Sequence, residues 1–436
     1  MPPWGRLKEA VRPYYLRWLY FPLRPGQRPQ AFQECWRYPF QKIADQTRLP
    51  ESSGGRPDLL FYPMTDWHTR TQRTQHLVRA FAGLGFRCIY LNPHLGREFE
   101  TAPLFDRSHR LAQLEENIFE LHVRLPREPV FHDRLLEADE EEVIAAAVRQ
   151  VLPARSSVIQ ILSFPLWSGV ARRFRNESGF PIVYDCHDLL SGFANISGEI
   201  LAAEKELLRE ANLVLFSSQG LADRYGQGKK WVLVRNAVTA SAFVTANKIP
   251  SSQSAGYVGA LDSWFDIEAV EEAAAHNPQC RFVLAGRVEF EPIRCLQTLP
   301  NVELIGEIPY RQVPELLSGW RVALIPFRIN PLTLMTNPIK LYEYFTCGLP
   351  VVSTALPEAQ AMGDLVYIGA DPREFARQVA AAFAENDPSL RARRKSIAAG
   401  ENWTGRAQEI MRIFQEFGWQ TKSRMDRQTG APAPKN

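Results

Sequence analysis

Two series of short apolar runs alternate with amphipathic stretches along the chain. Runs of four to nine residues rich in Val, Ile, Leu and Phe are typical of buried strands, and apolar spacing of three and four residues is typical of helices. The first series predicts strands at 58–64, 87–92, 156–164, 181–188 and 213–218 and a helix at 73–86. The second predicts strands at 255–261, 281–288, 301–308 and 322–327 and helices at 266–278, 313–320 and 405–419.

Strand–helix–strand repetition with apolar strands indicates a parallel sheet covered on both faces. Two such series predict an α/β protein with two doubly wound, Rossmann-like domains facing across a cleft. The passage 235–255 is polar and weakly periodic, as linkers are. We therefore expect an N-terminal arm, a first domain, a second domain, a C-terminal helix and a disordered tail, at 1–55, 56–240, 251–405, 406–422 and 423–436.

Composition narrows the class of protein only slightly. The 436 residues are 45% hydrophobic and 23% charged, which is ordinary for a globular chain, and the net charge of +3 does not call for a nucleic-acid partner. The six cysteines show neither a CxxC pair nor Cys/His metal spacing. We expect no metal site and a reducing compartment, hence a cytoplasmic protein.

The first 55 residues carry aromatic side chains interleaved with Arg and Lys. One interpretation is an irregular arm packed on a domain surface. The other is a peripheral contact with the inner face of the membrane, in which the aromatic rings enter the headgroups and the cations meet anionic lipid. Pro13, Pro22 and Pro25 break any long helix in this arm.

The segment 336–354 is the most informative stretch for chemistry. Its pattern predicts a loop, a helix begun by Thr336 or Asn337 and ended at Gly348, and a buried strand. Because ligands lie beyond the carboxyl ends of parallel strands, the N-terminus of this helix is expected at a ligand site. Lys340 suits a phosphate there, and Glu343 suits the hydroxyls of a ribose. The alternative is an ordinary surface pair three residues apart.

The residues of this segment resemble the donor site of retaining GT-B glycosyltransferases of family four. "NPIKLYEYFTCGLPVVST" is most similar to the branch that includes teichuronic-acid-type and other polysaccharide glycosyltransferases. "DWHTRTQRTQHLVRAF", "YDCHDLLSGF" and "GYVGALDSWFDIEAV" resemble other parts of that branch in the same order. The resemblance extends from about Asp58 to Phe414 and implies the GT-B fold.

The resemblance also implies roles for individual residues. Glu343 would bind the ribose of the donor, and Lys340 would bind and stabilise the departing phosphates. The same donor site would include Arg328, Asn330, Asn337 and Arg287. The expected catalytic residues besides Lys340 are His68, Asp185 and His187, and the expected acceptor-binding residues are Arg70 and Arg73.

Two departures from the family pattern stand beside these matches. Many members carry a second glutamate eight positions before the one that matches Glu343, and here that position is Met335. The usual Gly-Arg and Lys phosphate pair after the first strand of the second domain is also absent, since "GALDSWFD" stands there. More of the phosphate binding therefore falls on Lys340, Arg328 and Arg287.

We expect a retaining, metal-independent transferase that moves a sugar from a nucleotide sugar to a glycan or lipid-linked acceptor in polysaccharide or cell-envelope synthesis. The nucleotide sugar is a co-substrate, and no further cofactor is expected. One alternative is a catalytically inactive GT-B-like binding or scaffold subunit of a glycan-synthesis complex, since fold does not fix function. A nucleotide-sugar epimerase has the same architecture, but no residues here match one.

Overall fold

A computed structural model describes residues 45–46, 48–50, 55–67, 70–95, 109–125, 131–153, 156–228, 230–243 and 253–419. The chain forms two compact units. The first holds the described parts of Met1–Asp185, Asn195–Val214 and Ala407–Asn436. The second holds those of Cys186–Ala194 and Leu215–Arg406. The bounds of these two units differ from the domain limits expected from the sequence. Those domain limits stay a prediction.

The first sheet has nine described strands in the order β1-β4-β5-β3-β2-β6-β7-β8-β9. The pairs β2–β3, β3–β5, β2–β6 and β6–β7 are parallel. The strands are β1 (Asp45–Gln46), β2 (Asp58–Tyr62), β3 (Cys88–Leu91), β4 (His109–Glu115), β5 (Ile118–Val123), β6 (Val158–Leu162), β7 (Ile182–Cys186), β8 (Leu213–Phe216) and β9 (Trp231–Leu233).

One edge of this sheet is antiparallel, which the sequence did not predict. Strand β4 pairs antiparallel with both β5 and β1, so the sheet is mixed rather than purely parallel. The β4–β5 turn contains Asn117, whose φ of 60° is one that asparagine tolerates better than most residues. The side of β4 away from the core is half-exposed, and its sequence lacks the continuous apolar run of the parallel strands.

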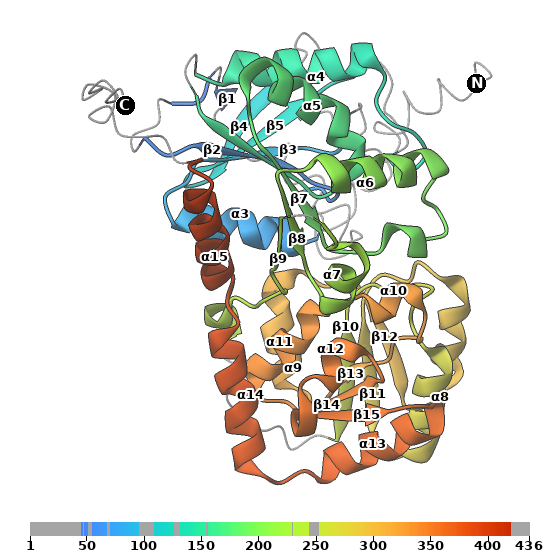
Figure 1. Cartoon of the computed structure of the whole chain (residues 1–436). Coiled ribbons are helices and arrows are strands. Elements are labelled where there is room, and N and C mark those ends of the chain that lie inside the picture. The colour runs from blue at the N-terminus through green and yellow to red at the C-terminus, as the bar shows by residue number, and fades with distance from the viewer. Residues whose placement is uncertain are drawn as a thin grey trace, which may run out of the picture. The chain divides into compact units, whose positions relative to one another are not determined.

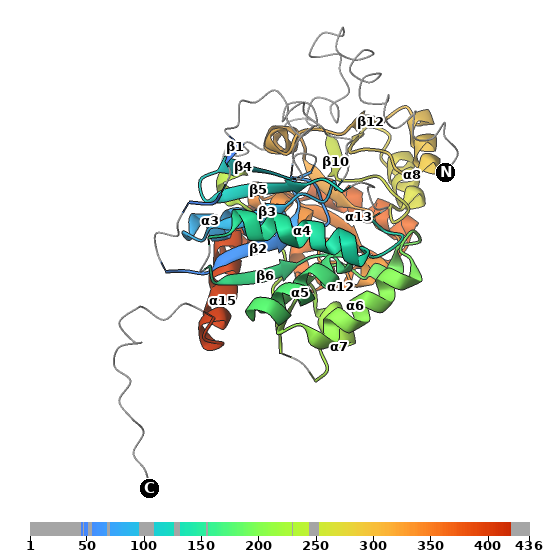
Figure 2. The ribbon, with the colours of Figure 1, turned by 90° about the horizontal axis from the view of Figure 1, so that it is seen from above.

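Helices cover both faces of the first sheet. Helix α3 lies on one side, and α4 and α5 lie on the other (Figure 1), as the view from above also shows (Figure 2). The helices numbered before β9 are α3 (Arg73–Gly83), α4 (Ala138–Val151), α5 (Ser168–Ser178), α6 (Gly198–Glu210) and α7 (Gln219–Tyr225).

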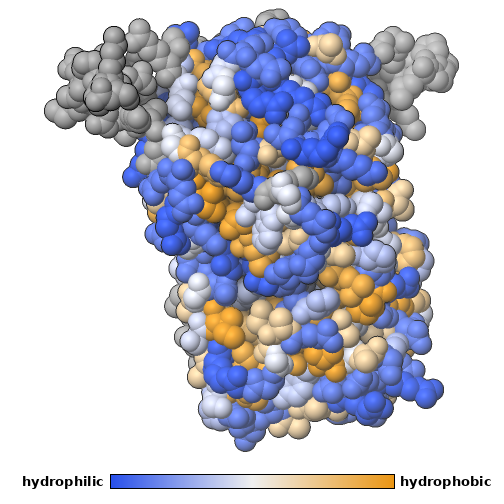
Figure 3. Space-filling model, in the orientation of Figure 1, coloured by the Kyte–Doolittle hydropathy of each residue, from blue (hydrophilic) through white to orange (hydrophobic). Residues whose placement is uncertain are grey.

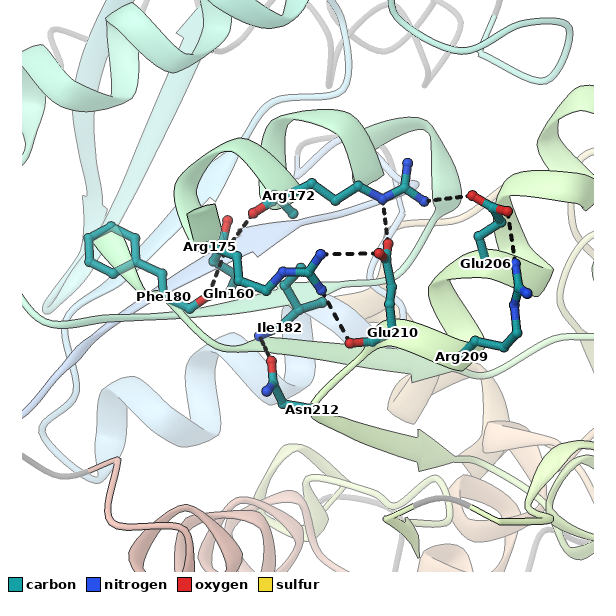
Figure 4. A network of polar contacts seen from close by, with 10 residues as sticks. Gln160, Arg172, Arg175, Phe180, Ile182, Glu206, Arg209, Glu210 and Asn212 are labelled. Carbon is teal, nitrogen blue, oxygen red and sulfur yellow. Dashed lines mark hydrogen bonds and ion pairs between the residues drawn. The ribbon is translucent and has the colours of Figure 1, made fainter. Parts of the chain in front are cut away.

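Ion pairs connect α5 to α6 in the first unit (Figure 4). Glu210 accepts hydrogen bonds from Arg172, at 2.5 Å, and from Arg175, at 3.1 Å. Glu206 accepts from Arg172 and from Arg209, at 3.5 and 2.8 Å. Because these side chains are partly exposed, each pair contributes less than about 1 kcal/mol, and the network serves mainly to fix the two helices beside one another.

The second sheet has six strands in the order β12-β11-β10-β13-β14-β15, and every pairing in it is parallel. The strands are β10 (Ser254–Val258), β11 (Arg281–Ala285), β12 (Val302–Gly306), β13 (Val322–Ile325), β14 (Val351–Thr354) and β15 (Val366–Gly369). The helices are α8 (Ile267–His276), α9 (Val313–Ser318), α10 (Pro331–Leu334), α11 (Ile339–Cys347), α12 (Pro357–Gln360), α13 (Pro372–Ala384), α14 (Pro388–Gly400) and α15 (Trp403–Glu416).

The core of the second unit is built from the apolar strands and the helix faces that cover them. Trp320, which is 2% exposed, occupies the space above Gly256 of β10, where a Cβ atom would lie 2.1 Å from the indole ring. Helix α15 instead brings Phe414 back to the first unit, where its ring stacks on Phe81 of α3 at 6.2 Å.

No helix among the described residues is long and apolar enough to cross a bilayer. On the face drawn in Figure 3, hydrophilic side chains are mixed with smaller groups of hydrophobic ones. The expected arm at 1–55 lies almost entirely outside the described residues, and the expected tail at 423–436 lies wholly outside them.

Candidate functional site

Helix α11 sits where the sequence placed it, after β13 and before β14. Its C-terminal glycine is confirmed, because Gly348 has a left-handed φ of 69°. The expected start is wrong by a residue or two, since Pro338 is the N-cap and neither Thr336 nor Asn337 is. Asn337 does not cap the helix, because its Oδ1 accepts from the backbone N–H of Asn236 instead.

Lys340 lies in the first turn of α11 against aromatic rings. Its Nζ is 5.2 Å from the ring centroid of Tyr257 and 4.8 Å from that of Phe327. Burial lowers the pKa of this amine from 10.5 to about 8, and the nearby Glu343 opposes the change. The ammonium of this half-buried lysine is thus stabilised by ring faces and one carboxylate.

Glu343 lies one turn further along α11 and is 6% exposed. Burial raises the pKa of its carboxyl, while a hydrogen bond from Tyr310 and the charge of Lys340 lower it. A surface pair would be solvated, so the interpretation of Lys340 and Glu343 as an ordinary helix-surface pair does not describe this geometry. A buried carboxylate beside an amine is an arrangement suited to binding hydroxyl and phosphate groups together.

Two glycines let the loops after β10 and β11 approach Lys340. Gly259 has a φ of 145°, and a Cβ atom there would lie 3.2 Å from Cε of Lys340. A Cβ atom on Gly286 would lie 1.8 Å from the carbonyl oxygen of Gly259, so only glycine fits. Neither glycine was predicted from the sequence as part of the site. The available signal was a glycine directly after each of two neighbouring parallel strands.

Three other expected donor-site residues lie on loops that follow β11 and β13. Arg328 is exposed, and its backbone N–H donates to the carbonyl of Trp264 at 2.8 Å. Asn330 caps α10 by accepting from the N–H of Thr333 at 3.0 Å. Arg287 has a side chain 58% exposed that pairs with Glu289. Their roles in binding a donor stay predictions.

Asn337, the remaining expected donor-site residue, is 2% exposed and its amide is fully engaged. Its Oδ1 accepts from the backbone N–H of Asn236 at 2.9 Å. Its Nδ2 donates to the hydroxyl of Tyr342 at 3.1 Å and to Oε2 of Glu358 at 3.0 Å. One acceptor and two donor hydrogens are thereby used within the protein.

In the first unit the structure joins two residues for which the resemblance implied different roles. Arg73, expected to bind the acceptor, places its Nε 2.9 and 3.0 Å from the two carboxylate oxygens of Asp185, expected to be catalytic. Both side chains are at most 2% exposed. Removing either side chain would leave a buried charge with one ion-pair partner fewer, which is costly at this depth. The roles of Arg73 in acceptor binding and of Asp185 in catalysis stay predictions.

The remaining expected catalytic and acceptor-binding residues are His187, Arg70 and His68, and the first two are less buried than Arg73 and Asp185. His187 is partly buried, with its Nε2 3.6 Å from Oδ2 of Asp188. Its carbonyl accepts from the hydroxyl of Ser217 at 2.9 Å. Arg70 is partly buried, and its carbonyl accepts from Gln75. His68 lies outside the described residues.

A buried polar cluster in the first unit was not predicted. Asn92, directly after β3, donates to Oε1 of Glu120 at 2.6 Å, and Glu120 is fully buried. His94 places its Nε2 3.5 Å from Oδ2 of Asp66. The signal in the sequence was the polar pair Asn92 and His94 immediately beyond a strand. Within the described ranges, no group of three or more His, Cys, Asp or Glu side chains is arranged to hold a metal ion.

Comparisons with known proteins agree with this architecture. Residues 253–385 match the family described as "Glycosyl transferases group 1". The chain is 27% identical over 265 residues to TuaH of Bacillus subtilis (strain 168), named as a teichuronic acid biosynthesis glycosyltransferase. That match covers 53% of this chain and 66% of TuaH.

Solved structures show the same fold at low sequence identity. Sucrose-phosphate synthase from Thermosynechococcus elongatus superposes with a TM-score of 0.64 at 16% identity, over 83% of this chain and 99% of that one. Anabaena Alr3699/HepE in complex with UDP-glucose gives a TM-score of 0.60 at 15% identity, over 83% and 100%. The expected GT-B fold is confirmed, and the segment 253–385 of the second unit is similar to the group 1 glycosyltransferases.

Proposed function

We propose that the protein is a retaining, metal-independent glycosyltransferase that moves a sugar from a nucleoside-diphosphate sugar to a glycan or lipid-linked acceptor. The observation that carries this proposal is the pair of half-buried Lys340 and buried Glu343 at the head of α11, within the family-matched region. TuaH is named for teichuronic acid biosynthesis, and this name supports a polysaccharide acceptor.

The donor nucleotide would lie at the carboxyl end of the second sheet. Glu343 would accept hydrogen bonds from the ribose hydroxyls, and Lys340 with the first N–H groups of α11 would bind the diphosphate. The close approach of Gly259 and Gly286 leaves backbone rather than side chains near the phosphates. HepE structures contain UDP and UDP-glucose, which supports a uridine nucleotide as the first donor to test.

Catalysis in this proposal is charge stabilisation on the departing diphosphate together with positioning of the acceptor. The transition state has oxocarbenium character as the bond from the anomeric carbon to the phosphate oxygen breaks. Lys340 and the α11 N-terminus stabilise the negative charge that develops on that oxygen. The acceptor hydroxyl attacks from the same face, and its proton passes to the leaving phosphate. Retention rests on the family resemblance alone.

Binding of nucleotides is the first experiment. We expect one of UDP, GDP, dTDP and CMP to raise the melting temperature in a concentration-dependent way. Glu343→Ala should weaken that nucleotide by about 10–100-fold, because a hydrogen bond to a charged group contributes about 1.5–3 kcal/mol. Glu204→Gln is the matched control. It alters a carboxylate that is 3% exposed in the first unit and accepts from Tyr184 at 2.9 Å.

Activity assays then separate an enzyme from a scaffold. A labelled nucleotide sugar should be transferred or slowly hydrolysed in the presence of EDTA, and proton NMR of the product should show the anomeric configuration of the donor. If the protein binds a nucleotide saturably but neither transfers nor hydrolyses the sugar, the result supports the alternative of a catalytically inactive scaffold subunit. If no nucleotide binds and Glu343→Ala leaves cellular glycan unchanged, the transferase proposal is wrong.

A further inference from the structure

The loop that leads into α11 is held by contacts from three distant parts of the second unit. The hydroxyl of Ser218 donates to the carbonyl of Met335 at 2.6 Å. Asn236 contacts Asn337 twice. Its backbone N–H donates to Oδ1 of Asn337, and its Nδ2 donates to the carbonyl of Asn337 at 2.6 Å. Met335 and Asn337, which flank Thr336 just before Pro338, are therefore both fixed by hydrogen bonds.

Glu358 is the charged centre of this network and is 4% exposed. Its Oε1 accepts from the backbone N–H of Gln219 at 2.9 Å. Its Oε2 accepts from Nε of Arg235 at 2.9 Å and from Nδ2 of Asn337 at 3.0 Å. Three hydrogen bonds to one carboxylate join the start of α7, the segment after β9 and the entry to α11, and charge makes each of them stronger than a neutral bond.

We propose that Asn337 and Glu358 are positioning residues that fix the head of α11, and with it Lys340 and Glu343, in the geometry that the donor diphosphate requires. Asn337 precedes Lys340 by three residues and uses all its amide groups within the protein, so it acts through the helix rather than on the ligand. A displacement of about 1 Å at a binding group can cost up to 100-fold in rate. This proposal rests on the donor role of α11 proposed above.

The positioning role is tested by exchanging the amide of Asn337 and the carboxylate of Glu358. Glu358→Gln removes the charge, and Asn337→Asp places a carboxylate against Glu358. Each single variant is expected to raise the Kd of the diphosphate that the wild-type protein binds, and the donor KM, by about tenfold. In the double variant the amide of residue 358 donates to the carboxylate of residue 337. The expected Kd returns part of the way to the wild-type value, because Arg235 loses Oε2 of residue 358 as its acceptor.

Two controls distinguish positioning from general loss of stability. Glu204→Gln changes a buried carboxylate of the first unit and is expected to lower the melting temperature without changing the Kd. The pKa of the Lys340 amine, followed by NMR of labelled lysine and assigned with Lys340→Met, reports the helix head without any nucleotide. It is expected to rise from about 8 toward 10.5 in each single variant and to return to about 8 in the double variant.

The outcomes separate the two proposals. If the wild-type protein binds no nucleotide while the pKa of Lys340 responds as expected, the proposed function fails, and only the role of Asn337 and Glu358 in fixing the head of α11 stands. If both single variants leave the Kd and the pKa of Lys340 unchanged, the positioning proposal is overturned. The same conclusion follows if the double variant is no better than the single variants.

Discussion

Lys340 is the residue at which the proposed binding of a diphosphate would oppose stability most directly. Its amine is charged at pH 7 although burial against Tyr257 and Phe327 lowers its pKa to about 8. Since the usual pKa of lysine is 10.5, the folded state binds this proton less tightly than the unfolded state does. The resulting penalty is fully present below about pH 8 and disappears as the pH rises toward 10.5.

Lys340→Met should therefore stabilise the unliganded protein while weakening the diphosphate complex. At pH 7 we expect the free energy of unfolding to rise by about 1 kcal/mol and the Kd of the diphosphate to rise by about tenfold or more. In the wild-type protein, affinity should fall as the pH passes 8, and in the variant this fall should be absent. Urea denaturation and calorimetric titration from pH 6.5 to 9.5 measure the two effects.

Lys205→Met provides the matched control, because Lys205 is an exposed lysine of α6. It should change neither the Kd nor its pH dependence. A fall in affinity above pH 8 that persists in Lys340→Met would show that another group titrates there. That outcome would contradict the proposal that Lys340 binds the phosphates.

The sequence predicted the positions of some functional side chains but not the hydrogen-bond partners of others. Spacing placed Lys340 and Glu343 on one face of one helix, because local periodicity decides which face two residues share. Their donor role was predicted from the position of the helix head and from the family resemblance. The environment of Asn337 was not predictable, because its partners Asn236 and Glu358 are 101 and 21 residues away. The same holds for Arg73, whose partner Asp185 is 112 residues away. Long-range hydrogen bonds leave no periodic signal.

At the scale of elements, the parallel strands were predictable because burial on both faces makes them continuously apolar. The antiparallel β4–β5 pair was missed for the converse reason. Strand β4 alternates buried and exposed positions only in part, and its turn at Asn117 lacks an Asn-Gly or Asp-Gly signal. The helix α11 was found, but its first residue depended on where the side chain of Asn337 is engaged.

The contact between the loops after β10 and β11 leaves no room for a side chain at Gly286. Gly286→Ala would place a Cβ atom 1.8 Å from the carbonyl of Gly259, so the two loops must separate. We expect a loss of about 2–3 kcal/mol in the free energy of unfolding, as in overpacked cores. We also expect a higher Kd for the diphosphate, because the Gly259 loop lies against Lys340. Urea denaturation and nucleotide titration measure both quantities.

Gly83→Ala is the companion variant, since Gly83 ends α3 with no atom within 4 Å of the added Cβ. Alanine should stabilise that helix slightly, by up to about 1 kcal/mol, because it loses less backbone entropy on folding than glycine does. Should Gly286→Ala behave like Gly83→Ala, the close approach of the two loops would be refuted.

At the scale of the whole molecule, the N-terminal arm is tested by its effect on membrane contact. We propose a cytoplasmic protein that associates peripherally with the membrane through residues 1–55, since aromatic and basic side chains together favour the headgroup region. Full-length protein should float with liposomes containing anionic lipid, and a truncation beginning at Arg56 should not. Added salt should weaken flotation.

Neutral liposomes serve as the control, because the attraction of basic side chains requires anionic lipid. Should the full-length protein and the truncation remain unbound on both kinds of liposome, the arm does not contact membranes. The truncation should still bind the diphosphate, since Lys340 and Glu343 belong to the second unit.

The order of residues along the chain also sets a condition on how the protein is made. The chain leaves the first unit after Asp185, returns between Asn195 and Val214, and returns once more from Ala407 onward. On a ribosome, N-terminal domains usually fold first. Here Phe81 is fully buried and stacks on Phe414, so the face of its ring that meets Phe414 stays uncovered until almost the entire polypeptide has emerged. A truncated product of stalled translation would therefore expose this aromatic face and be a natural target for chaperones.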